Sequence, residues 1–244
     1  MNLRTIIIFA LLVCACILPL HAQVGEQRHN FAVGVNGGIN LNSVSFSPSV
    51  KQKNLMGING GVTARYISEK YFSMICGAQI ELNFSQHGWD EFYEDYPELQ
   101  YTRKMNYVEI PFLAHLAFGK EQRGVQFFIH AGPQIGFFLS DSYTMSDNWD
   151  NYSGITVEQH DKPVENKFDY GIAGGAGLEI RTGIGDFLLE GRYYYALSDF
   201  YHSTKKDYFS RSAHGVISAK ITYLFDLKNK KEARICFSTF VPLL

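Results

Sequence analysis

Two histidines and a glutamate are the residues of this chain whose types and spacing could hold a metal ion. His115 and His130 fall on the polar faces of two neighbouring expected strands, and Glu109 precedes His115 in the first of them. Two imidazoles and a carboxylate form a ligand set that Zn²⁺ accepts. The same histidines could instead hydrogen-bond to polar side chains in the interior, and we favour that interpretation. We therefore expect no metal and no cofactor.

Catalytic motifs are missing from the sequence. It has no G-x-S-x-G, no HExxH and no pair of carboxylates at catalytic spacing. Gly171, Gly174, Gly175 and Gly177 match neither the dinucleotide fingerprint nor a P-loop, and they lie inside a strand pattern, where glycine lets neighbouring side chains pack closely. The formal charge of −2 offers no footprint for nucleic acid. We expect a protein that is not an enzyme and has no small-molecule substrate.

A stretch rich in aromatic and acidic residues is the strongest candidate for a contact surface. The aromatic residues are Trp89, Phe92, Tyr93 and Tyr96, and the acids between them are Asp90, Glu91, Glu94, Asp95 and Glu98. Aromatic side chains are enriched where proteins contact each other, so a long exposed loop of this composition predicts a protein partner. The alternative is a solvated loop that folds on itself.

Apolar residues recur at every second position in eight segments, and this period indicates β-strands. The segments are residues 31–40, 55–67, 72–85, 107–118, 125–139, 168–181, 187–197 and 214–225. Several are longer than the usual five or six residues of a soluble strand and approach the length of a tilted membrane strand. No later segment has the unbroken apolar run of a helical membrane span.

The connections alternate in length, as they do in a transmembrane barrel. Long polar segments at 41–54, 86–101, 141–167 and 199–212 are interleaved with short ones at 68–71, 119–124 and 183–185. Short periplasmic turns and long outer loops produce this rhythm. The sequence therefore predicts an all-β fold: an eight-stranded antiparallel up-and-down transmembrane β-barrel. Both termini of the chain would then lie in the periplasm.

The composition of the two strand faces suggests which one is inside. The polar face carries a candidate lumen charge network of four acids and four bases: Arg65, Glu81, Glu109, Glu179, Arg181, Glu190, Arg192 and Lys220. Turned inward, these groups could pair and fill a barrel that is too narrow for a pore. Aromatic residues near strand ends on the other face fit the two membrane interfaces. A soluble barrel with the faces reversed is the alternative.

The chain begins with the pattern of a secretory signal peptide. Arg4 precedes an apolar run over 6–20, and Leu20-His21-Ala22 predicts cleavage before Gln23. An uncleaved anchor and a lipoprotein modified at Cys16 are alternatives. The expected organisation is a signal peptide at 1–22, an outer-membrane β-barrel domain at 23–227 and a periplasmic tail at 228–244. Cleavage would leave Cys76 and Cys236, which could form one disulfide.

Four phrases within residues 28–227 resemble the PorT-like family of outer-membrane β-barrels. They are residues 107–112 (YVEIPF), 131–136 (AGPQIG), 168–177 (FDYG followed by GGAG) and 190–199 (EGRY followed by LSD). The tail is a departure, because many barrels end on an aromatic residue and here Phe225 is followed by a lysine-rich segment.

The resemblance implies a non-enzymatic component of a type IX secretion system. It implies transport and maturation of secreted proteinases of the gingipain type, with the lipid bilayer and other secretion proteins as partners and cargo contacted indirectly. It implies no catalytic residue. A surface adhesion barrel that uses its exposed loops is the first alternative, and a membrane-associated assembly factor that faces the periplasm, at the inner membrane, is the second.

Overall fold

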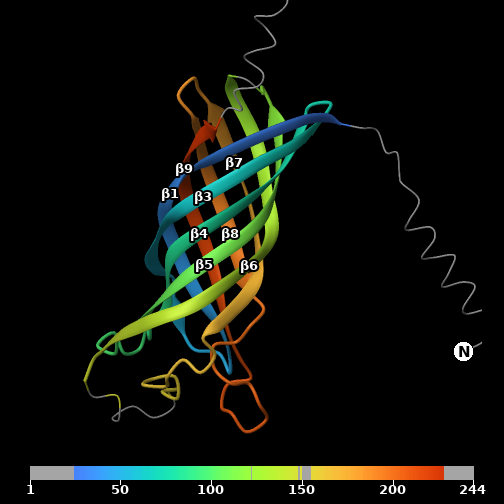
Figure 1. Cartoon of the computed structure of the whole chain (residues 1–244). Coiled ribbons are helices and arrows are strands. Elements are labelled where there is room, and N and C mark those ends of the chain that lie inside the picture. The colour runs from blue at the N-terminus through green and yellow to red at the C-terminus, as the bar shows by residue number, and fades with distance from the viewer. Residues whose placement is uncertain (1–24, 122, 148, 150–154, 228–244) are drawn as a thin grey trace, which may run out of the picture.

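The computed structural model describes residues 25–121, 123–147, 149 and 155–227, and in it the eight segments with a period of two lie in eight strands, to which a two-residue strand is added (Figure 1). The strands are β1 Glu26–Ser47, β2 Gln52–Lys53, β3 Leu55–Tyr71, β4 Met74–Glu91, β5 Tyr101–Gly119, β6 Gly124–Met145, β7 Phe168–Arg181, β8 Asp186–Ala196 and β9 Arg211–Leu227. The expected signal peptide, the tail at 228–244 and Cys236 lie outside the described residues. Among the described residues, Cys76, in β4, has no disulfide partner.

Eight of these strands close into a ring. Each pairs with its neighbours in antiparallel fashion, and β1 closes the ring because it pairs with β3 on one side and with β9 on the other. The short β2 pairs with the end of β4, where Gln52 lies opposite Glu91. The predicted eight-stranded antiparallel barrel is therefore confirmed, with β2 as an addition outside the ring.

Short and long connections gather at opposite ends of the barrel. The turns after β3, β5 and β7 lie at the top of Figure 1, with the start of β1, and we call this the turn end. The long connections lie at the bottom, at what we call the loop end. Phe72 belongs to a turn and has a φ of 53°, so the sequence placed it in a strand wrongly. Its side chain is 88% exposed at the turn end.

An apolar band covers the outside of the barrel. Val35, Ile58 and Ile221 are apolar, and each is more than half exposed. In β4 and β5 the band consists of Met74, Cys76, Ala78, Ile80, Leu82 and Phe84 and of Val108, Ile110, Phe112, Ala114, Leu116 and Phe118. Each stretch has the length that a tilted strand needs to cross a bilayer, about 9–11 residues. No helix among the described residues is long and apolar enough to cross a membrane.

Strands β4, β5 and β6 continue past this band at the loop end. Gln86, Thr102, Lys104 and Ser142 are polar and face outward there, while the strands remain paired. The long loops predicted at 86–101 and 141–167 are therefore too long, because β4 runs to Glu91 and β6 to Met145. The outward-facing side chains are polar in these strand ends, so the sequence no longer alternates between apolar and polar residues there. The backbone hydrogen bonds between the strands nevertheless continue.

Depth in the band predicts the cost of a charge on the outer face. Ile80→Lys places an ammonium near the middle of the apolar band, so we expect the free energy of unfolding in a lipid bilayer to fall by about 2–4 kcal/mol. Thr102→Lys is the matched control, because Thr102 also faces outward but lies beyond the band, where the cost is about 0–1 kcal/mol. Denaturant titration in vesicles measures both. Equal losses in the two variants would contradict the assigned band.

Candidate functional site

Four charged residues near the turn end of the lumen form one cluster, which we call the turn-end cluster: Arg65, Glu179, Arg181 and Asp186. Arg65 donates from Nη1 to Glu179 Oε2 (2.7 Å) and from Nη2 to Asp186 Oδ2 (2.5 Å). Arg181 Nε donates to the other oxygen of Glu179 (2.8 Å). Arg65, Glu179 and Asp186 are each at most 2% exposed at the side chain. These contacts join β3 to β7 and β8 across the barrel.

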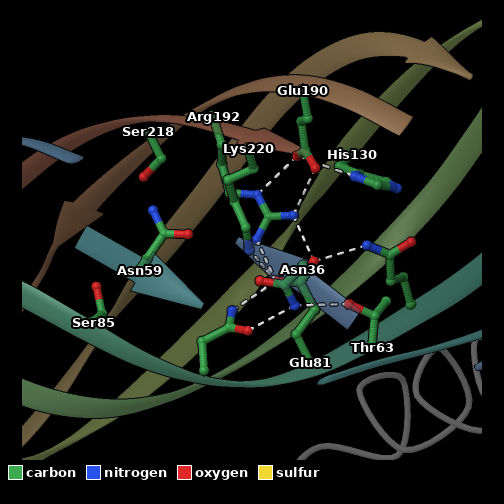
Figure 2. Close-up of polar contacts among 12 residues, drawn as sticks. Asn36, Asn59, Thr63, Glu81, Ser85, His130, Glu190, Arg192, Ser218 and Lys220 are labelled. Atoms are coloured by element: carbon green, nitrogen blue, oxygen red, sulfur yellow. Dashed lines mark hydrogen bonds and ion pairs between the residues drawn. The ribbon is translucent and has the colours of Figure 1, made fainter. Parts of the chain in front are cut away.

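A second group, the central cluster, consists of Glu81, Glu190, Arg192 and Lys220 (Figure 2). Arg192 binds Glu81 with two N–H groups, at 2.8 and 3.0 Å, and donates from Nε to Glu190 (2.8 Å). Lys220 Nζ donates to Glu81 Oε2 at 2.5 Å. All four side chains are buried. Buried charges of this kind are stable only when they are paired and hydrogen-bonded, and here each charge meets an opposite one.

Two histidines connect the clusters. His115 Nδ1 and His130 Nε2 are 2.8 Å apart, His130 Nδ1 lies 3.1 Å from Glu190, and His115 Nε2 lies 3.7 Å from Glu179. Glu109 does not join them, because its carboxylate contacts His87 Nε2 at 2.8 Å. Among the described residues no group of three or more His, Cys, Asp or Glu side chains could hold a metal ion. The histidine pair bridges carboxylates.

The structure places all eight predicted network residues on the inner face of the wall. Seven are buried, and Arg181 is half-buried. Seven of the eight belong to one or other of the two clusters. The eighth, Glu109, pairs with His87 and not with an arginine or lysine. The sequence missed Asp186 and His87. Residues separated by an even number of positions in a strand lie on the same face. Asp186 precedes the inward-facing Glu190 by four positions and His87 follows the inward-facing Glu81 by six, so the sequence pattern places both on the inner face.

Beside the central cluster the lumen contains a small polar cavity. Its volume is about 20 Å³, and Asn59, Glu109, Arg192 and Lys220 are among the lining residues. A volume of about 10–15 Å³ holds one water molecule, and a water needs polar partners of this kind. Asn59 Oδ1 has no hydrogen-bond partner in the protein. The cavity therefore suits one bridging water and is far too small for a solute.

Glycines in β7 allow the wall to approach the packed lumen. A Cβ at Gly177 would lie 2.1 Å from the backbone oxygen of Leu189 and 2.7 Å from the ring of Phe128. A Cβ at Gly175 would meet the Glu190 carboxylate at 2.9 Å. All three distances are shorter than a van der Waals contact, so only glycine fits at these two positions. This agrees with the structural role expected for the glycine-rich stretch.

Aromatic residues fill the loop end and form a structure that we call the loop-end cap. Its buried core comprises Val44, Phe46, Val50, Trp89, Tyr93, Leu99, Tyr101, Met105, Tyr107, Trp149, Val164, Phe200, Tyr201 and Phe209. These residues come from three strands, β1, β4 and β5, and from the connections after β1, β4, β6 and β8. The cap is therefore a second core, stacked on the polar lumen.

The predicted contact loop is partly wrong, because two of its four aromatic residues belong to this core. Trp89 lies within β4 and is fully buried, and Tyr93 is 8% exposed. Phe92 and Tyr96 are 41% and 36% exposed. Trp89 stayed buried because the inward phase of β4 continues past the membrane band, where the ring packs on Phe46 and Phe200.

Glu91 anchors the cap. Its carboxylate accepts hydrogen bonds from Trp89 Nε1 (3.1 Å) and Gln159 Nε2 (2.9 Å), and it lies 3.1 Å from His160 Nε2. Arg103 on β5 similarly donates to Lys162 O (2.6 Å) and to the hydroxyl of Tyr201 (2.8 Å). The connection between β6 and β7 is thus held over the lumen by two buried charges. The sequence analysis placed Glu91 in an exposed contact loop instead, and it did not single out Arg103.

The turn end has its own polar closure. Glu121, in the turn after β5, accepts hydrogen bonds from Arg28 on β1 and from Lys70 on β3 (2.8 Å). Arg181 donates to the backbone oxygen of Glu121 at 2.8 Å. Arg28 comes from β1, on the opposite side of the ring from this turn, so the turn lies across the barrel mouth. The hydrogen bond from Arg28 is the main cause that lowers the pKa of Glu121 to about 2.

Removal of the central guanidinium tests the paired-charge interpretation. Arg192→Met leaves Glu81 and Glu190 buried without their main partner, so we expect a loss of about 3–5 kcal/mol in the free energy of unfolding. Arg192→Met/Glu190→Gln should lose less, because one of the two orphaned carboxylates is removed. The control is Lys53→Met, which breaks an exposed pair with Asp90 and should cost under about 1 kcal/mol. A loss in Arg192→Met no larger than the control would contradict the interpretation.

Acid should weaken the closure at the turn end. Because the folded state lowers the pKa of Glu121 from an ordinary 4.5 to about 2, its stabilising effect is complete above pH 4.5 and disappears as the pH falls toward 2. Glu121→Gln should therefore unfold at a lower temperature than the wild type at pH 7, and the two curves should converge near pH 2. Thermal unfolding between pH 7 and 2 measures this. A difference that is constant across this range would argue against the assigned ion pairs.

Comparison with known proteins identifies the class of this barrel. Residues 21–202 match the family model described as outer membrane protein beta-barrel domain, and a search of curated proteins gives no match. The solved structure of OprG from Pseudomonas aeruginosa aligns with a TM-score of 0.50 and 11% identity, over 84% of this chain and 99% of that one.

Two other outer-membrane proteins align with lower scores. Ail, the attachment invasion locus protein of Yersinia pestis, gives a TM-score of 0.36 at 14% identity, over 82% of this chain and 99% of that one. Neisserial surface protein A gives 0.39 at 13%, over 79% and 96%. At such identities the likeness to OprG shows the fold alone, whereas the family match covers most of the sequence. The chain belongs to the outer membrane protein β-barrel family and lies in the outer membrane of the cell.

Proposed function

We propose that this chain is a non-enzymatic component of a type IX secretion system, needed for the transport and maturation of secreted proteinases of the gingipain type. The observation that carries the proposal is the arrangement of the four phrases that resemble the PorT-like family. They lie on β5, β6, β7 and β8, which are consecutive in the wall. Glu109 lies opposite Gly136, Gly136 opposite Asp169, and Gly175 opposite Arg192. The phrases form one continuous half of the barrel.

The packed lumen supports the role of a component and argues against that of a conduit. The turn across the mouth, the two charge clusters and the loop-end cap occupy successive levels of the described barrel, and the cavity beside the central cluster holds about one water. An unfolded polypeptide needs a passage many times wider. Cargo would therefore cross the membrane elsewhere, and this barrel would act through its two ends and its outer wall, by contact with other secretion proteins.

A surface-binding barrel is the second candidate, and the exposed part of the loop-end cap favours it. Phe92 and Tyr96 keep about two fifths of their surface exposed, and Glu94 and Asp95 between them are exposed acids. Exposed aromatic residues among charges are typical of contact surfaces. This surface could bind a host or matrix protein, or it could be the place where secretion partners bind.

A clean deletion separates the two functions. If the secretion role holds, cells without this gene retain proteinase cargo inside the cell in its unprocessed form, and the full chain supplied in trans restores secretion. Immunoblots of cell and medium fractions measure cargo size and location. Phe92→Ser/Tyr96→Ser supplied in trans tests whether the exposed aromatic pair takes part. Normal secretion in the deletion strain, with loss of surface binding only, would refute the secretion role and support the adhesion barrel.

A further inference from the structure

One edge of the barrel wall is open at the loop end. Pairing between β6 and β7 ends where Phe137 lies opposite Phe168, but β6 continues to Met145 and stays paired with β5 on its other side. Among the described residues, the only further backbone bond on the β7 side is from Phe138 N–H to Lys167 O (2.8 Å). Residues 140–145 therefore form a strand edge that pairs with no strand in the described part of the chain, and we call it the β6 edge.

A bulge directs this edge away from the ring. The register between β5 and β6 shifts at Asn106 and Tyr107, which lie opposite Ser140 and Phe138, so Leu139 is the extra residue. A bulge bends its strand and increases its twist. The bulge lies where the outward row changes from apolar to polar, so the β6 edge lies beyond the membrane band. Figure 1 shows the paired ends of β5 and β6 running outward from the barrel at the lower left.

The chain protects a comparable edge elsewhere. Pairing of β1 with β3 ends where Asn42 lies opposite Leu55, and the next edge position, Val44, is capped by a side chain. Gln52 Oε1 accepts from Val44 N–H at 3.0 Å, and Gln52 Nε2 donates to Val44 O at 2.5 Å. Natural proteins also blunt edges with lysine, with proline and with bulges that turn the edge aside. The β6 edge, with sequence SDSYTM, carries neither of these residues.

We propose that the β6 edge binds an extended polypeptide segment of another protein, which adds to the wall as a further strand. An unpaired edge offers a row of backbone N–H and C=O groups, and an extended peptide is the ligand that satisfies such a row. The side chains give the partner its pattern. Tyr143 and Met145 are 52% and 42% exposed on the face that bears Tyr101 and Arg103, whereas Ser142 and Thr144 face the other way. The partner segment therefore alternates apolar and polar residues.

Binding of a defined peptide to the full chain in nanodiscs tests this proposal. The probe is a fluorescent peptide of about ten residues that alternates valine and threonine, and fluorescence anisotropy measures its affinity. Two further versions carry N-methyl groups on alternate amides. Because only every second amide of a strand faces the edge, one methylated version should bind about tenfold more weakly than the other. No binding of the parent peptide, or equal binding of both methylated versions, would overturn the proposal.

Proline variants test the same edge from the protein side. Ser142 and Tyr143 are adjacent, so the N–H of one faces β5 and the N–H of the other faces the open edge. Each residue is changed to proline in a separate variant. The informative variant is the one that keeps the heat-modifiable gel migration of a closed barrel. It should bind the peptide about tenfold more weakly. Lys104→Ala is the matched control, because Lys104 lies opposite Ser142 on β5, and it should leave affinity unchanged. Unchanged affinity in the informative proline variant would refute strand addition.

Two other occupants of the edge have distinct signatures. Slow hydrogen exchange at the edge-facing amides of residues 140–145 in the purified protein would mean that the chain's own residues cover the edge. Concentration-dependent dimers joined by a cross-link between Ser142→Cys positions would mean that a second copy covers it. Either result would overturn the proposal. Purified protein suffices for these measurements, so their outcome is independent of the secretion phenotype of the deletion strain.

Discussion

A guanidinium that is removed from water needs acceptors for its N–H donors and a negative charge nearby, and Arg192 meets both needs inside the barrel. It makes four hydrogen bonds to the carboxylates of Glu81 and Glu190. These two carboxylates belong to β4 and β8, which lie on different sides of the lumen. Lys220 supplies a second positive charge to Glu81, and His130 contacts Glu190. Burial of these ions is tolerated only with such geometry, because each ion alone would cost several kcal/mol to desolvate.

This constraint determines the rest of the architecture. The charged groups reach each other only if the ring is narrow, so the lumen is packed and the wall must approach closely, as Gly175 and Gly177 permit. A packed lumen leaves the ends and the outer surface available for function. The two ends are closed in different ways. Ion pairs of Glu121 close the turn end, and aromatic residues around Glu91 close the loop end. Chemistry inside the barrel thus serves stability, and contacts with other molecules belong to the exterior.

Much of the wall could be predicted from the sequence, because strand geometry has a period of two and fixes which residues share a face. All eight predicted network residues point inward for that reason. Their partners could not be predicted, since the stagger around a closed ring decides which strands meet, and Arg65 contacts Asp186 across a separation of 121 residues. Trp89 was wrongly predicted to lie in a loop because the outward-facing residues of β4 turn polar at Gln86, which ends the apolar alternation. The inward-facing residues stay buried as far as Glu91, so the strand continues.

The outward row of side chains turns polar at Gln86 in β4 and at Asn106 in β5, and this change explains why the loop end differs from the turn end. Within the band, the outer face must be apolar and every backbone group must be paired within the wall, because lipid offers no hydrogen bonds. Beyond the band, water satisfies unpaired backbone groups, so strands can end at different heights and an edge can remain open. β7 begins at Phe168, at the loop-end limit of the band, whereas β6 continues past it to Met145. The open β6 edge is therefore possible only where the wall has left the membrane, which is also where another protein could reach it.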